Sequence, residues 1–149
     1  MEENILEIVE KSCRIYRDVI AVKYLSHREI VEKSYGDMWD DIRKTAVILR
    51  NNGLCGTHIA LVGSSSYEWI CAYMAILFTG NTAVPLDANL SVSELHELLN
   101  RSGSIALFCG ASRKDVITEL TDDCPEMNIV FTMEKKVDIE HLELSLIHI

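Results

Sequence analysis

The chain has 149 residues, of which 48% are hydrophobic and 25% are charged, and its formal net charge is −9. This composition is typical of a globular chain that forms one domain or one piece of a larger protein, and it excludes a disordered chain. Because Lys and Arg are outnumbered by Asp and Glu, the chain has no excess of cations to neutralise phosphates, which disfavours nucleic-acid binding and attraction to an acidic membrane surface.

The N-terminal sequence Met-Glu-Glu-Asn-Ile lacks the basic region and apolar core of a signal peptide. The longest apolar run, residues 69–78, is much shorter than the roughly 20 residues that cross a bilayer. We therefore predict a cytoplasmic protein in which this run forms a buried helix and no segment spans a membrane.

Disulfide and metal sites have little support in the sequence. The cysteines are odd in number and form no Cys-x-x-Cys pair, and no two histidines have His-x-x-x-His spacing. We expect reduced structural cysteines and no metal site. The residues considered are Cys13, Cys55, Cys71, Cys109, Cys124, His27, His58, His96, His141 and His148.

The first third of the chain predicts a short helix, a hairpin and a longer helix. Residues 4–17 have an apolar helical face, and residues 20–25 and 28–33 alternate as strands around a tight turn at Ser26 and His27. A helix is predicted to begin at Ser34, with Asp37 at its positive end, and to end at Gly53. The apolar face of the first helix comprises Ile5, Ile8, Val9 and Ile15.

Opposite faces of the longer helix are expected to differ in burial, because apolar residues recur at three- and four-residue steps. The residues predicted to face inward are Trp39, Ile42, Ala46 and Leu49. Those predicted to face solvent are Asp40, Asp41, Arg43 and Lys44.

From Thr57 the pattern changes to alternating strands and helices, which predicts an α/β fold with a mostly parallel sheet and right-handed βαβ crossovers behind the N-terminal hairpin. Two of the helices have predicted capping boxes, Ser65 with Glu68 and Ser91 with Glu94. The third helix is predicted near residues 113–120. The predicted strands are 59–62, 82–86, 105–109 and 128–132.

Gly63-Ser64-Ser65-Ser66 lies between a strand and a helix, where backbone amides could hold a phosphate. Without the Lys of a phosphate loop, serines in this place are more often helix caps, which is the interpretation we favour. The segment is not a serine-hydrolase elbow either, because Tyr67 stands where Gly-x-Ser-x-Gly needs its second glycine.

Two further groups of residues could carry chemistry but have simpler interpretations. The adjacent carboxylates Asp40–Asp41 and Asp122–Asp123 point in different directions on a helix, and solvated faces explain them better than acid–base pairs. An aromatic set has helical spacing on apolar faces, which favours core packing over a ligand-stacking box. This set is Trp39, Tyr67, Trp69 and Tyr73.

Several motifs occur in the order found at the start of one enzyme superfamily, over approximately residues 5–131. Ser34-Tyr35-Gly36-Asp37-Met38 resembles its Thr-Tyr-x-Glu-Leu motif, and residues 58–62 resemble its first buried strand. Ser65-Ser66-Tyr67-Glu68-Trp69 stands where Ser-Pro-Glu-Trp is common, and Gly80 to Asp87, ending Pro-Leu-Asp, is the strongest match. The chain thus resembles the N-terminal part of an AMP-binding, adenylate-forming enzyme, with particular similarity to bacterial long-chain fatty acid–CoA ligases.

This resemblance implies an ATP-dependent acyl-CoA synthetase in which a carboxylate attacks the α-phosphate and the acyl group of the resulting adenylate passes to CoA. ATP, Mg²⁺ and CoA are implied for the longer parent enzyme and not for this chain, because the family's phosphate loop and catalytic lysine follow the matched region. We therefore assign no catalytic, cofactor-binding or metal residue. Pro85, Leu86 and Asp87 are interpreted as scaffold, Asp87 by accepting a hydrogen bond two residues on.

The resemblance also predicts the domain organisation. Residues 1–132 are expected to form an incomplete AMP-binding domain, and residues 133–149 a charged linker with a truncated, non-native tail. The expected partner is the missing C-terminal part of the same enzyme, with a small carboxylate as its substrate. Two alternatives stay open: a self-contained, non-catalytic α/β binding or regulatory module, and a doubly wound nucleotide-binding domain that senses a ligand through residues 63–66.

Overall fold

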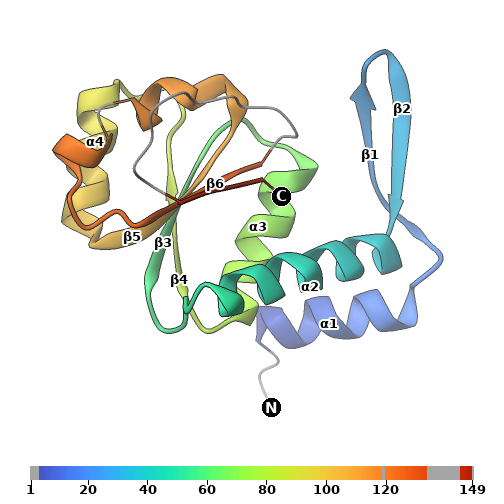
Figure 1. Ribbon diagram of the computed structural model, residues 1–149. Helices are drawn as coiled ribbons and strands as arrows, with labels where there is room; N and C mark the ends of the chain where they lie inside the picture. The colour runs from blue at the N-terminus through green and yellow to red at the C-terminus, as the bar shows by residue number, and fades with distance from the viewer. Residues whose placement is uncertain (1–3, 119, 134–144, 149) are drawn as a thin grey trace.

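The computed structural model describes residues 4–118, 120–133 and 145–148 (Figure 1). An N-terminal helix and hairpin precede a layered α/β body. The helices are α1 (Ile5–Ile15), α2 (Tyr35–Asn51), α3 (Tyr67–Phe78), α4 (Val92–Ser102), the 3₁₀ helix η1 (Ala111–Ile117) and α5 (Leu120–Asp123). The strands are β1 (Ile20–Ser26), β2 (Glu29–Ser34), β3 (His58–Val62), β4 (Thr82–Leu86), β5 (Ser104–Cys109), β6 (Ile129–Thr132) and β7 (Ser145–His148).

The main sheet has the strand order β4-β3-β5-β6-β7, and each neighbouring pair is parallel. The predicted α/β fold with an N-terminal hairpin and a parallel sheet is therefore confirmed. Pro85 lies in β4, at an edge of the sheet, where a residue without an N–H is tolerated. Strand β7 was not predicted, and the charged segment 134–144 lies outside the described residues, so the proposed domain division stays a prediction.

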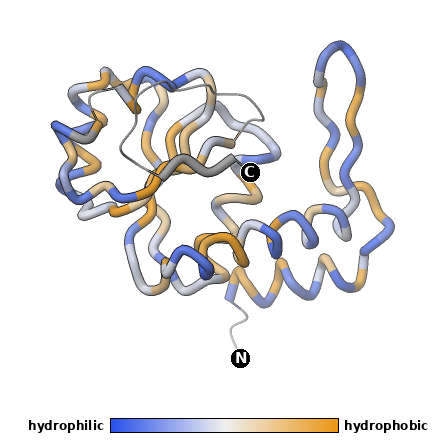
Figure 2. The backbone as a smooth tube through the Cα atoms, viewed as in Figure 1, coloured by the Kyte–Doolittle hydropathy of each residue, from blue (hydrophilic) through white to orange (hydrophobic). Residues whose placement is uncertain are grey.

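Side chains of the sheet alternate between two apolar layers, and Figure 2 shows hydrophobic colour along much of the central sheet. Ile59 and Leu61 face the layer built with α2 and α3, whereas Ala60 and Val62 face the layer of α4, η1 and α5. The layer under α2 and α3 is continuous across three strands, because Leu61 of β3 is the neighbour of Phe108 in β5, and Phe108 is the neighbour of Phe131 in β6. Strands buried on both faces explain why they read as unbroken apolar runs.

Two of the three predicted helix starts are confirmed and one is wrong. The side chains of Ser34 and Ser91 cap α2 and α4 in capping boxes with Asp37 and Glu94. At α3 the cap is Ser66 and not Ser65, because Ser66 Oγ accepts from the Trp69 amide at 3.1 Å. The third residue of this helix is then Trp69, which has no carboxylate to complete a box.

The hairpin turn and the third crossover also differ in detail from the prediction. The turn is His27–Arg28, one residue later than expected, and both residues have positive φ (49° and 70°), as a two-residue type I′ turn requires. In place of one helix over 113–120, η1 and α5 occur as separate short helices. Arg113 leaves the helical conformation at φ −126°, and its guanidinium donates to the carbonyls of Ala88 and Leu90.

The predicted apolar face of α1 is largely uncovered. Ile5, Ile8 and Ile15 are 59%, 46% and 61% exposed, while Cys13 is fully buried. The helix therefore contacts α2 through a neighbouring face, which the spacing of its isoleucines did not indicate.

Candidate functional site

The carboxyl ends of the parallel strands are the first place to look for a site, because ligands of open α/β sheets bind where the strand order reverses. In this sheet the chain adds β4 on one side of β3 and then crosses to add β5 on the other side. The reversal places residues 63–66, after β3, beside residues 110–113, after β5. Ser64 Oγ and Ser112 Oγ lie 3.4 Å apart across it.

The two loops are closed on each other at their glycines. The Gly110 amide donates to the Val62 carbonyl at 2.9 Å, so the β3–β5 pairing continues past the end of the strands. A Cβ at Gly63 would lie 3.2 Å from the Gly110 backbone and 3.1 Å from Met133 Cε. The crevice in which other doubly wound folds hold a phosphate is therefore filled at this point.

Polar groups at this edge hold the loops and not a ligand. Ser66 caps α3, and Asp87 Oδ1 accepts from the Asn89 amide at 2.8 Å, which confirms the predicted turn after Pro-Leu-Asp. Arg113 joins the loop after β4 to η1, because its guanidinium also forms two 3.0 Å hydrogen bonds with Asp115. Its charge is thus neutralised locally, and the capping interpretation of the serine segment has more support than phosphate binding.

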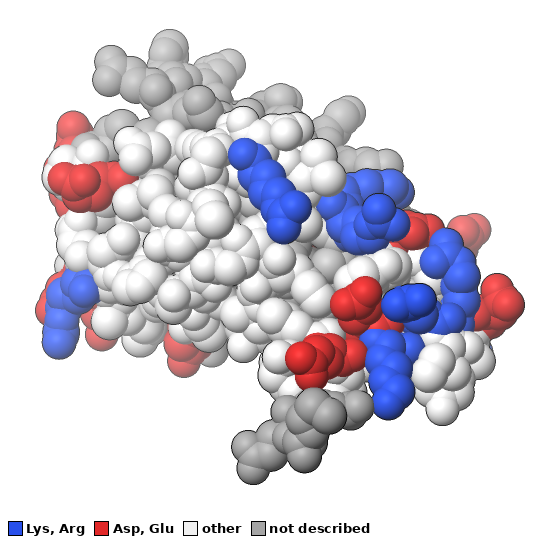
Figure 3. Space-filling model, turned by 90° about the horizontal axis from the view of Figure 1, so that it is seen from below, with Lys and Arg blue, Asp and Glu red and all other residues white. Residues whose placement is uncertain are grey.

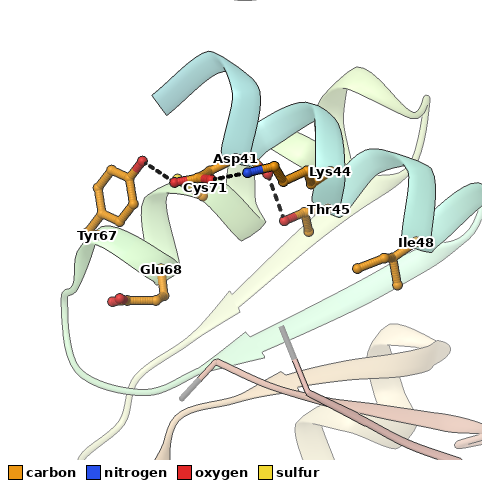
Figure 4. A pocket seen from close by; sticks show the side chains of 7 residues that line it. All are labelled: Asp41, Lys44, Thr45, Ile48, Tyr67, Glu68 and Cys71. Atoms are coloured by element: carbon orange, nitrogen blue, oxygen red, sulfur yellow. Dashed lines mark hydrogen bonds and ion pairs between the residues drawn. The ribbon is translucent and has the colours of Figure 1, made fainter. Parts of the chain in front are cut away.

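A second candidate is a hollow of about 340 Å³ between α2 and α3 (Figure 4). Asp41 lines it and accepts hydrogen bonds from Tyr67 Oη at 2.8 Å, Lys44 Nζ at 3.2 Å and Lys33 Nζ at 3.3 Å. Tyr67 also stacks on Tyr24 of the hairpin, with ring centroids 5.8 Å apart. The remaining lining residues are Thr45, Ile48, Glu68 and Cys71.

Burial and charge fix the protonation of this cluster at neutral pH. Partial burial raises the pKa of Asp41, but hydrogen bonds from Tyr67 and Lys44 and the charge of Lys33 outweigh it, so the pKa is lowered overall. Burial and the Asp41 hydrogen bond raise the pKa of Tyr67, and burial raises that of Cys71 to about 12. An ionised carboxylate with three donors, beside a protonated thiol, is a structural clamp and offers neither a general base nor a nucleophile.

Replacing Tyr67 with phenylalanine is expected to lower the free energy of unfolding by about 1 kcal/mol at pH 7, because Asp41 loses a donor that only its ionised form needs. The pKa of Asp41 is lowered on folding, so its contribution to stability is present above the unfolded pKa and disappears as pH falls through the folded pKa. The difference between Tyr67→Phe and wild type, measured by urea unfolding at several pH values, should therefore shrink in acid below about pH 4. Tyr73→Phe is the matched control, and an equal loss in both variants at all pH values would contradict the clamp.

The carboxylate pairs are not only solvated faces, which corrects the sequence interpretation. Asp41 belongs to the cluster above, and Asp123 Oδ2 lies 2.7 Å from His96 Nδ1. The buried His96 ring also lies 2.8 Å from the Val116 carbonyl through Nε2. These two contacts hold the His96 ring of α4 against η1 and α5. Asp40 pairs with Arg17, and Asp122 is exposed.

The aromatic residues do not converge on one ligand site. Trp39 packs edge-on against Phe78, Trp69 stacks on Tyr73, and Tyr67 stacks on Tyr24. The Trp39 contact joins α2 to α3 and the Tyr67 contact joins α3 to β1, whereas the Trp69–Tyr73 stack lies within α3, and all three agree with the core-packing interpretation. Sequence reasoning missed the Asp41–Tyr67 and His96–Asp123 contacts, since no local signal joins residues that are 26 and 27 positions apart.

Among the described residues no group of three or more His, Cys, Asp and Glu side chains could hold a metal ion. Within the same residues no helix is long and apolar enough to cross a membrane. Figure 3 shows most of the Lys and Arg of the face it draws toward one side, with Asp and Glu among them and further basic residues elsewhere on the face. The face that Figure 3 draws therefore has no unbroken basic patch. Among the ion pairs of the molecule, Arg17 pairs with Asp40 and Lys33 with Asp41.

Comparisons with known proteins agree with the fold. The family described as AMP-binding enzyme matches residues 9–145. The hybrid PKS-NRPS synthetase apdA of Emericella nidulans is 32% identical over 90 residues, which cover 60% of this chain and 2% of that protein. The acyl-CoA ligase cnsG of Penicillium expansum is 25% identical over 105 residues, which cover 70% of this chain and 21% of that ligase.

The crystal structure of coronafacic acid ligase from Pectobacterium brasiliense has the same fold over nearly the whole chain. It aligns with a TM-score of 0.85 and 23% identity, covering 98% of this chain and 28% of that one. The chain therefore spans between about one fiftieth and little more than a quarter of the lengths of these three proteins.

Proposed function

This chain belongs to the AMP-binding enzyme family, and we propose that it is the N-terminal part of an ATP-dependent acyl-CoA synthetase. The single observation that carries the proposal is the family match over residues 9–145 in a chain that spans only 21% of an acyl-CoA ligase. The order of the sequence motifs, which include Pro85-Leu86-Asp87, supports an N-terminal position of that span in such an enzyme.

The proposed reaction has two steps. A carboxylate oxygen bonds to the α-phosphorus of ATP as the bond to pyrophosphate breaks, which gives an acyl-adenylate. The thiolate sulfur of CoA then bonds to the acyl carbon, and AMP leaves with the electron pair of the C–O bond. The resemblance at Gly80 to Asp87 and Ala88-Asn89-Leu90 favours a long-chain fatty acid as the carboxylate.

The described residues do not form a site for the phosphates of ATP or for Mg²⁺, both of which this reaction needs. The edge at Gly63 and Gly110 is closed, Arg113 is paired, and no carboxylate cluster suited to Mg²⁺ is present among the described side chains. We therefore derive no step of the reaction through this part of the chain. Its role in the proposal is to form the parallel sheet and its two helical layers, on which the rest of the enzyme is assembled.

The proposal is tested by comparing the 149-residue chain with the product of the extended reading frame. Carboxylate-dependent exchange of pyrophosphate into ATP, measured with acids of two to eighteen carbons, reports the first step, and thioester formation with CoA reports the second. We expect both activities in the extended product, greatest for long acids, and neither in the 149-residue chain. If none of these acids supports exchange of pyrophosphate into ATP by the extended product, the proposed function is overturned. If only short acids support exchange, the long-chain assignment is overturned.

A further inference from the structure

The hairpin of β1 and β2 forms a separate two-stranded sheet beside the α/β body (Figure 1). One of its faces is packed, since Val22 and Tyr24 contact the apolar layer of α2 and α3. An isolated two-stranded hairpin is at best marginally stable in water, and a third strand or a covered apolar face is needed for stability. Only one of the two hairpin faces has such cover among the described residues.

The opposite face of the hairpin carries an exposed apolar pair. Leu25 and Ile30 are directly opposite in the antiparallel register, and each is 72% exposed. Lys23 and Glu32 are two residues further along on the same face and pair with each other at 2.5 Å. Because Lys23 and Glu32 pair with each other, an apolar partner on Leu25 and Ile30 would meet no unpaired charge from these two residues.

The size of this patch decides between two occupants. A second copy of the chain would need roughly 1,200 Å² or more of buried surface for a stable dimer, which a face of two apolar side chains does not supply. A segment of the same polypeptide needs far less, because the covalent link gives it a high effective concentration. The chain spans 28% of coronafacic acid ligase, so a protein of that length has ample further polypeptide.

We propose that an apolar segment of the polypeptide beyond residue 149 packs on the hairpin face formed by Lys23, Leu25, Ile30 and Glu32, and so holds the hairpin in place. This inference rests on the proposed function, because it requires the longer enzyme. The hairpin is then a docking element for the remainder of the protein, and its contact through Tyr24 and Tyr67 links that docking to the Asp41 cluster.

Hydrogen exchange of the hairpin amides in the 149-residue chain and in the extended product tests this proposal. We expect exchange to slow at least about tenfold in the extended product, because a covered hairpin opens less often. The double variant Leu25→Lys with Ile30→Lys should return the exchange in the extended product to the rate seen in the 149-residue chain. Val47→Lys, at a position on α2 that is 55% exposed, is the matched control and should leave hairpin exchange unchanged.

The outcomes separate this inference from the proposed function. An extended product that is active as a ligase, but whose hairpin exchanges as fast as in the 149-residue chain, would overturn the packing and leave the function intact. Slowed exchange in a product without carboxylate-dependent pyrophosphate exchange would support the packing and overturn the function. Slowed exchange that survives the double lysine variant would place the contact elsewhere and overturn the assigned face.

Discussion

Replacing Phe108 with alanine is expected to lower the free energy of unfolding by about 3 to 5 kcal/mol, the largest effect of any single substitution considered. Phe108 is fully buried in the row Leu61–Phe108–Phe131 that crosses three parallel strands, and its ring stacks on Phe131 with centroids 4.6 Å apart. Its removal leaves a cavity in the middle of the layer beneath α2 and α3, where a rigid sheet cannot collapse to fill it. Urea unfolding followed by circular dichroism measures the change.

Phe108→Leu is the matched control for this prediction, because it keeps most of the buried volume and should cost clearly less, about 1 to 2 kcal/mol. The two variants together distinguish a cavity from a general intolerance of substitution. A loss below about 1 kcal/mol for Phe108→Ala would mean that this row is not the centre of the packed layer.

Replacing Gly63 with alanine is expected to cost about 2 to 4 kcal/mol, because two separate penalties coincide at this residue. Its φ of 155° lies in a region that other residues rarely adopt. The added Cβ would also meet the Gly110 backbone at 3.2 Å, and that backbone is fixed by its hydrogen bond to Val62. The loop after β3 must therefore separate from the loop after β5, which thermal unfolding would detect as a lower midpoint.

Gly103→Ala separates the two penalties. Gly103 has φ of 63° as the C-cap of α4, and a Cβ there would meet nothing within 4 Å, so only the backbone cost of about 1 to 2 kcal/mol applies. If both variants lose the same stability, the close approach of the two loops contributes nothing and the strand edge is more open than the structure indicates.

The fold was predictable where a signal is local and repeated. Strands β3, β5 and β6 are largely buried and lie between the two apolar layers, so each reads as a short run of apolar residues separated from the next by a helical pattern. Serine followed three residues later by an acid marked the starts of α2 and α4, because the cap and the acid lie within one turn. At α3 the same signal selected Ser65, since three adjacent serines leave the choice of cap to the tertiary structure.

The candidate clusters were not predictable for a related reason. Asp41 was predicted to face solvent because it lies off the apolar face of its helix, yet Tyr67 of α3 donates a hydrogen bond to it. Asp123 was assigned to solvent as well, and its partner is His96 on α4. Both contacts depend on how helices pack, which neither spacing nor composition records. The same holds for α1, where tertiary packing buries Cys13 and leaves three isoleucines exposed.

The proposed function was inferred from the order of sequence motifs, because the described residues do not form a catalytic or ligand-binding site. Gly63-Ser64-Ser65-Ser66 looked like a possible phosphate loop, and its geometry instead shows a helix cap and a closed pair of glycines. The Pro-Leu-Asp segment ends an edge strand and forms a turn, which is scaffold chemistry. The cytoplasmic location and the absence of bound ATP, Mg²⁺ and CoA stay predictions.

The central claim, that this chain is the start of an adenylate-forming ligase, is tested most directly by sequencing the genomic DNA beyond codon 149 and translating its reading frame. We predict a frame that continues for several hundred codons and encodes a loop rich in Thr, Ser and Gly that ends in lysine, the phosphate-binding feature that this reaction needs. A stop codon directly after Ile149 would contradict the claim and favour a non-catalytic α/β module.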